Sequence, residues 1–255
     1  MSKIKYIILG IISSFTNSLP ISYNAHIKIY DNIFNTKIFN DQYLPSFLNI
    51  SLIIAILIIN YKVLINFSKK ILKKQKIKKK HHFLKILTIS SFISIFFLPF
   101  NKCPSNIKLI AIFYLLTSII LLFSNNKKDN RKITDLNLKD SLIIGLFNIT
   151  SIIPTISPLC SNIFICSKRK IDKSLSFIYS TLCYIPILLI NSIKGITFLL
   201  NNQTYILDYS ISLIISTFLS IYFLNYLKKL YYSNKMYKLS FYCIFLTIFL
   251  LIWFR

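Results

Sequence analysis

The sequence predicts an all-α polytopic membrane protein, with six spanning helices plus two re-entrant helical hairpins in an inverted-topology repeat. Hydrophobic residues make up 55% of the 255 residues, and the mean hydropathy is +0.61. Several apolar runs approach the roughly 20 residues needed to cross a bilayer. The lysines gather in short loops between these runs, and two apolar segments are broken by proline at matching places.

The formal net charge of +24 does not indicate a nucleic-acid-binding protein. The lysines lie in short loops, where the positive-inside rule places them, so no nucleic-acid partner is expected. The acidic residues are all aspartates, and none lies deep within an apolar run: Asp31, Asp41, Asp129, Asp135, Asp140, Asp172 and Asp208. Intramembrane carboxylates are the usual chemical groups of pumps and membrane hydrolases, and this chain is expected to lack them. The first apolar run has no A-x-A-like site, so no cleavable signal is expected.

Six apolar runs predict the spanning helices, at about 45–67, 86–101, 109–124, 174–200, 207–227 and 239–254. Four basic loops lie at 69–85, 127–132, 168–173 and 228–238. All four are expected on the cytoplasmic side. Two spans separate the first loop from the second, and two separate the third from the fourth. An even number of spans returns the chain to the same side of the membrane, so each pair of loops shares a side.

The segment 141–166 lies alone between the second and third basic loops. If both of its ends are cytoplasmic, it must enter and return as a re-entrant hairpin, with the break at Pro154 and Pro158. Non-helical backbone at membrane depth must be covered by protein or line a wet cavity. The prediction is therefore a hairpin that points into the protein.

Residues 4–26 repeat this design, because Gly10, Asn17 and Pro20 match a glycine, an asparagine and a proline of the later segment. Each half would then be one hairpin and three spans, which inverts the second half relative to the first. The expected repeats are about 1–126 and 127–255 of a single membrane domain, 1–255. Alternatively, residues 4–26 simply span with the N-terminus inside, which Lys3 and Lys5 favour.

Four segments carry a resemblance to a known family. Residues 10–26 (GIISSFTNSLPISYNAH) resemble the signature Gly-x-x-Glu-x-x-x-Glu-x-Leu-Pro-x-Ser-Ser-Thr-Gly-His, and 136–157 resemble the approach to a second signature, Pro-Gly-x-Ser-Arg-Ser-Gly. Residues 177–187 and 237–253 resemble later helices of the same family. The family is the bacterial undecaprenyl-diphosphate phosphatases, also called bacitracin-resistance proteins. The resemblance implies six spans plus two re-entrant hairpins, in the inner (plasma) membrane of a bacterial cell.

The resemblance implies a site for a polyprenyl (undecaprenyl) diphosphate lipid, hydrolysed to the monophosphate to recycle the lipid carrier of cell-wall glycans. The candidate catalytic residues are His26 and Ser22, and the candidate substrate-binding residues are Ser13, Asn17, Asn24, Asn148 and Ser157. Mg²⁺ or Ca²⁺ is the implied electrostatic partner of the diphosphate, with unknown ligands. A homodimer is left open.

Each candidate also has a structural interpretation. His26 is either a catalytic base or a histidine bonded locally at a helix end. Ser22 and Ser157 either line a phosphate pocket or cap the helix breaks. Asn17 and Asn148 either face a wet cavity or have no functional role, since the chain contains many asparagines.

The chain departs from the signatures at the charged positions. Ser13 and Asn17 stand where the first signature has glutamates, and Pro158 stands where the second has arginine. Two hypotheses follow. The chain is a phosphatase that hydrolyses undecaprenyl diphosphate, or it is a catalytically inactive homologue that binds or translocates a polyprenyl-phosphate lipid.

Overall fold

The chain is mostly helical in the part that the computed structural model describes, residues 3–34, 43–65, 77–96, 106–124, 130–132, 135–153 and 155–253. No strand occurs in these ranges, apart from a single parallel bridge between Arg131 and Ile171. The α-helices are α1 (Lys3–Ser18), α2 (Tyr23–Phe34), α3 (Tyr43–Ile59), α5 (Ile77–Phe96), α6 (Ile107–Leu122), α7 (Leu138–Phe147), α8 (Pro158–Lys168), α9 (Lys173–Asn201), α10 (Ile206–Tyr232) and α11 (Tyr237–Trp253). Two 3₁₀ turns are η3 (Asn148–Ile152) and η4 (Gln203–Tyr205).

Two helical segments are long and apolar enough to cross a bilayer, Lys173–Asn201 and Gln203–Tyr232. Among the described residues, four shorter apolar helices overlap the other predicted spans, and a fifth, Tyr6–Ser18, lies in the first broken segment. Large apolar side chains on α5, α10 and α11 are largely exposed, as Phe92, Phe218 and Ile252 show at 77%, 72% and 72%. A surface this apolar suits contact with lipid.

The main difference from the sequence prediction is at α5. This helix begins at Ile77, so the second part of the predicted basic loop 69–85 is helical. Lysine is a good helix former, and a run of lysines can therefore extend a helix past the end of its apolar stretch. Charge alone does not mark where such a helix begins.

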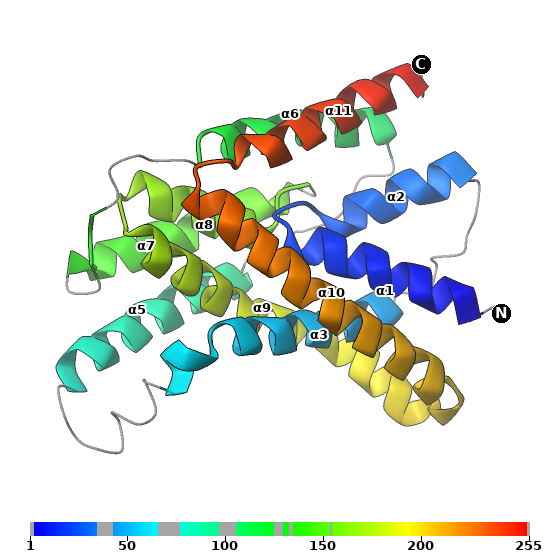
Figure 1. Cartoon of the computed structure of the whole chain (residues 1–255), viewed down its shortest axis with the longest axis horizontal. Coiled ribbons are helices and arrows are strands. Elements are labelled where there is room, and N and C mark those ends of the chain that lie inside the picture. Colours follow the sequence, from blue (N-terminus) through cyan, green and yellow to red (C-terminus); the bar gives the residue numbers. More distant parts are fainter. Residues whose placement is uncertain are drawn as a thin grey trace.

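The helices pack in pairs that link the two halves of the chain (Figure 1). The helix α1 packs on α10, and α7 packs on α5. The helix α3 packs on α9, and α6 packs on α11. Each of these pairs joins one helix from before residue 127 with one from after it.

Each of the three glycines lies at one of these close helix contacts. A Cβ on Gly10 would lie 3.0 Å from the carbonyl oxygen of Ser212 in α10, and one on Gly145 would lie 2.9 Å from the Cβ of Ile93 in α5. Gly195 in α9 lies against the backbone of α3. Small residues let helices in membranes approach closely, and here they set three of the interhelical contacts.

A buried carboxylate joins the two ends of the segment α7–η3–α8. Asp140 is fully buried, accepts hydrogen bonds from Arg131 at 2.6 and 3.0 Å, and accepts one from Arg169 at 2.8 Å. It also accepts from the backbone N–H of Asn137, which completes a capping box at the start of α7. The backbone of Arg131 pairs with Lys170 and Asp172. The chain therefore enters and leaves this segment at one place.

Burial raises the pKa of Asp140, but the hydrogen bonds from Arg131, Asn137 and Arg169 outweigh burial and hold this pKa below its ordinary value of 3.8. The charged form is therefore the stable one in the folded protein. The stability that it contributes is present above pH 3.8 and is lost as the pH falls below that value.

Asp140→Asn should lower the free energy of unfolding by about 3 kcal/mol, because it removes the negative charge between two guanidinium groups. Thermal unfolding of the purified protein in detergent measures this change. The matched control is Asp135→Asn, an exposed carboxylate that accepts from the backbone N–H of Lys132. The control should cost less than about 0.5 kcal/mol, and the difference between wild type and Asp140→Asn should shrink below pH 3.8. Equal losses in both variants would contradict a structural role for the cluster.

Candidate functional site

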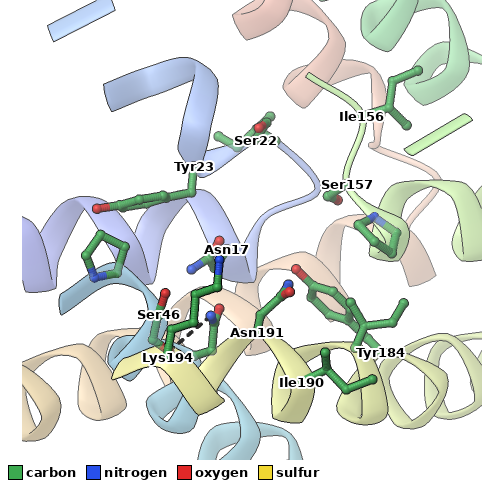
Figure 2. Close-up of a pocket in the computed structure, with 15 residues that line it drawn as sticks. Asn17, Ser22, Tyr23, Ser46, Ile156, Ser157, Tyr184, Ile190, Asn191 and Lys194 are labelled. Carbon is green, nitrogen blue, oxygen red and sulfur yellow. Dashed lines mark hydrogen bonds between the residues drawn. The ribbon is translucent and has the colours of Figure 1, made fainter. Parts of the chain in front are cut away.

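A cavity of about 450 Å³ lies where the two broken segments meet α3 and α9 (Figure 2). This volume falls within the range of small-molecule sites. Its walls come from the end of α1 and the turn into α2, the start of α3, the segment that leads into α8, and one face of α9. The lining residues are Asn17, Ile21, Ser22, Tyr23, Pro45, Ser46, Asn49, Ile156, Ser157, Pro158, Tyr184, Ile187, Ile190, Asn191 and Lys194.

The first broken segment brings Asn17 and Ser22 to the cavity. Asn17 lies near the end of α1, where its Nδ2 donates a 3.1 Å hydrogen bond to the hydroxyl of Ser13. This bond orients the amide from behind, because Ser13 is one helical turn earlier and buried. Ser13 does not line the cavity, so it can act there only through Asn17.

The second broken segment brings Ser157 and the start of α8 to the same cavity. Ser157 caps α8, since its hydroxyl accepts from the backbone N–H of Cys160 at 3.2 Å. Pro158 occupies the first helical position, where its missing N–H costs nothing. Helices α2 and α8 both begin at the cavity wall, at Tyr23 and Pro158. A helix N-terminus favours an anion through its free N–H groups and its dipole.

The helix α9 lines the opposite side with a stripe of four residues, Tyr184, Ile187, Asn191 and Lys194. Their spacing of three or four residues places them on one face of the helix. The stripe runs for about 15 Å. In Figure 2 the side chain of Lys194 rises from α9 toward Asn17. Lys194 is the one charged side chain among the described residues that line the cavity.

His26 lies one turn into α2 and is not among the lining residues. Its Nδ1 lies 2.7 Å from the carbonyl oxygen of Ser22, which can only accept, so Nδ1 carries the proton in the neutral ring. Its Nε2 accepts from the hydroxyl of Tyr242 at 2.8 Å, and the hydroxyl of Tyr114 lies 2.9 Å from Nδ1. The ring is therefore held by α6, α11 and the backbone of Ser22.

Asn148 lies away from the cavity, in a closed polar cluster. It is fully buried, and its Nδ2 donates to the hydroxyl of Ser94 at 2.6 Å and to Oδ1 of Asn162 at 2.9 Å. These bonds link η3 to α5 and α8. Asn24 lies in α2, but its side chain is outside the described part of the structure, and Pro154 is outside the described residues altogether.

The polar groups of the cavity do not fit a divalent cation held by the protein. Mg²⁺ and Ca²⁺ prefer carboxylate oxygens, supplemented by carbonyls and water. The described lining residues offer amides and hydroxyls, from Asn17, Asn49, Asn191 and three serines, but no carboxylate. No cluster of three His, Cys, Asp or Glu side chains occurs in the described ranges either. A hydrogen-bonding role for these groups follows more directly from their chemistry.

Besides Tyr23 and Tyr184, four polar cavity residues were not predicted from the sequence: Ser46, Asn49, Asn191 and Lys194. A signal for Lys194 was present, because it is the one charge in the interior of the predicted span 174–200. An ionisable residue inside a spanning helix indicates a functional site. The two asparagines and the serine carry no such signal in a chain rich in both residue types.

A family model and several known proteins match the chain over most of its length. Residues 6–249 match the family Bacitracin resistance protein BacA. Proteins named Undecaprenyl-diphosphatase from Thermosipho melanesiensis and Thermosipho africanus are 33% and 30% identical to the chain. Each match covers 95% of this chain, and 96% and 97% of the relative. A protein of the same name from Methanococcus vannielii is 28% identical over 96% of this chain and 98% of its own length.

The fold and these matches define a helical membrane protein. The chain belongs to the family Bacitracin resistance protein BacA. The resemblance drawn from the sequence signatures is thereby confirmed.

Gly195→Ala should destabilise the protein by about 2 kcal/mol, because the added Cβ would meet the backbone nitrogen of Phe47 and, at 2.6 Å, the carbonyl oxygen of Tyr43. Separation of α3 from α9 would also widen the cavity. The matched control is Gly10→Ala, which has the same gain in helix propensity but a 3.0 Å contact. Thermal unfolding in detergent should show a clear loss for Gly195→Ala alone, and equal stabilities would exclude a tight α3–α9 contact.

Proposed function

We propose that the chain hydrolyses undecaprenyl diphosphate to undecaprenyl monophosphate and inorganic phosphate. The observation that carries this proposal is the cavity between the two broken segments, whose wall holds two helix N-termini, several neutral donors and one lysine. Relatives that match nearly the whole chain are named for this activity. A lipid diphosphate is a ligand of matching chemistry, with a dense anionic head and an apolar tail.

The diphosphate would lie between Ser22, Ser157 and Asn17, with the N-termini of α2 and α8 facing its oxygens. Hydroxyl and amide groups donate to phosphate oxygens, and helix N-termini add favourable dipoles. The first isoprene units would contact the apolar part of the α9 wall, Ile187 and Ile190. Beyond them the tail would enter the lipid.

In the reaction, the oxygen of a water molecule attacks the terminal phosphorus, and the bond from that phosphorus to the bridging oxygen breaks. The bridging oxygen leaves on the lipid monophosphate. His26 is the one imidazole among the described side chains, and it would take the proton that the attacking water loses. Only Nε2 has a lone pair for this proton, because Nδ1 donates to the carbonyl oxygen of Ser22, so the proton would reach the ring through the hydroxyl of Tyr242. Ser22 would donate to the phosphate from the cavity wall.

The same proposal includes a multi-pass arrangement in the bacterial inner membrane, with six spans and two re-entrant hairpins, α1–α2 and α7–α8. Closure of the α7–α8 segment by Asp140 supports re-entry, since both ends lie together. The helix pairs support the inverted repeats, about 1–126 and 127–255. The first helix of each hairpin packs on the second span of the other half, at Gly10 and at Gly145.

A catalytically inactive homologue that binds or translocates a polyprenyl-phosphate lipid is the second candidate function. The observation that favours it is the composition of the cavity wall. Neutral side chains stand at Asn17 and Pro158, and the described lining residues include no carboxylate. Carboxylates move protons in many hydrolases, and their loss from a site lowers the rate more than the affinity.

Full-length protein in detergent micelles should release inorganic phosphate from undecaprenyl diphosphate, measured as a time course of free phosphate. His26→Ala should lower the rate by about 100-fold, the scale of a lost proton acceptor. Ser210→Ala serves as the control, because Ser210 lies on α10 outside the cavity and bonds its own helix backbone. Its rate should equal that of wild type. No release above that of His26→Ala would contradict hydrolysis by this site.

The triple variant Ser13→Glu, Asn17→Glu and Pro158→Arg tests the second function. If the missing charged groups limit catalysis, this variant should release phosphate about 100-fold faster than wild type, because preorganised charges contribute strongly to such steps. The comparison uses the same assay at equal amounts of folded protein. A variant no faster than wild type would show that these groups are not the limitation.

A further inference from the structure

Lys194 occupies an unusual place for a charged residue. The helix α9 runs from Lys173 to Asn201, and Lys194 is the one charge in its interior. Next to it on the helix, Ile193 is an exposed apolar side chain of the kind that faces lipid. A charge at such a position is costly unless it faces a partner or a wet cavity. Lys194 faces the cavity.

The surroundings of Lys194 contain no anion among the described residues. The polar groups that line the cavity with it are asparagines, serines and tyrosines. The two ion pairs of the described structure are both at Asp140, which is in a different part of the fold. The cavity therefore presents one uncompensated positive charge, beside two helix N-termini of the same polarity. An anion is the ligand that such a site favours.

We propose that Lys194 is the cationic anchor of the diphosphate. Its ammonium group would neutralise part of the negative charge of the diphosphate, in a cavity whose described lining residues offer no carboxylate to hold a divalent cation. The inference rests on the proposed diphosphate site and names the residue that recognises its charge. The Tyr184–Lys194 stripe is long enough to place different groups at the two ends of the cavity. The ammonium group lies at the α1–α3 end of the stripe, beside Asn17, while Tyr184 lies at the other end, near Ser157 (Figure 2).

This arrangement predicts a preference for two phosphates over one. A diphosphate spans more of the cavity than a monophosphate and carries more charge, so it gains more from an ammonium group at one end and donors at the other. The monophosphate product would lose most of this attraction. Lys194 would therefore hold the substrate and favour release of the lipid product.

The experiment measures binding of farnesyl diphosphate and farnesyl monophosphate to the full-length protein in detergent, with EDTA present, by calorimetry. Lys194→Met should weaken diphosphate binding by about 10-fold or more, the effect of one hydrogen bond to a charged group. Lys194→Arg should stay within about 3-fold of wild type, since it keeps the charge. Lys139→Met, an exposed lysine on α7 outside the cavity, is the matched control and should bind as wild type does. The monophosphate should show a smaller effect.

Two results would overturn the inference. One is equal diphosphate binding by wild type and Lys194→Met, as expected if this lysine only extends to the lipid headgroups. The other is wild-type binding that occurs with Mg²⁺ and is lost in EDTA. Lys194-dependent binding without phosphate release would support the anchor and contradict hydrolysis. Phosphate release with binding indifferent to Lys194 would contradict the anchor and leave hydrolysis in place.

Discussion

The buried carboxylate of Asp140 is the interaction on which the second half of the structure depends. Two of the chain's three arginines are committed to it, and together they bring the entry and the exit of the segment α7–η3–α8 to one point. Burial of a single unpaired carboxylate would cost several kcal/mol, so the cluster is stable only while both arginines remain. The segment between these ends folds back on itself, and its turn lines the same cavity as the turn between α1 and α2.

The breaks in these segments explain why the cavity is polar in an otherwise apolar protein. Backbone groups freed at a helix break must find partners or water. Ser157 satisfies one N–H of α8, and His26 satisfies the carbonyl oxygen of Ser22. Helices α2 and α8 begin at the cavity wall, at Tyr23 and Pro158. The breaks therefore bring polar side chains and helix N-termini to the wall of one cavity.

Much of the fold could be predicted from the sequence, because hydropathy and lysine-rich loops place apolar helices with little help from tertiary contacts. The start of α5 could not, since lysines continue a helix as readily as they form a loop. In the site, Asn17, Ser22 and Ser157 were predicted and line the cavity. Asn148 was predicted by the same matching of the two segments, but it lies in a closed cluster with Ser94 and Asn162. A repeated sequence pattern does not show which of the two matching residues faces the cavity.

The partners of His26 and the orientation of Lys194 depend on contacts between distant helices, which no local pattern encodes. Tyr114 and Tyr242 reach the imidazole from α6 and α11, and Lys194 faces a cavity that α1, α3 and the two broken segments complete. The net charge of the site can nevertheless be compared with the charge that the family signatures imply. The family signatures imply two carboxylates, one arginine and a divalent cation, which together carry one net positive charge. Lys194 alone carries the same charge. Under the proposal, Lys194 on the facing helix supplies the attraction for a diphosphate, while no described lining residue supplies a carboxylate that could move protons.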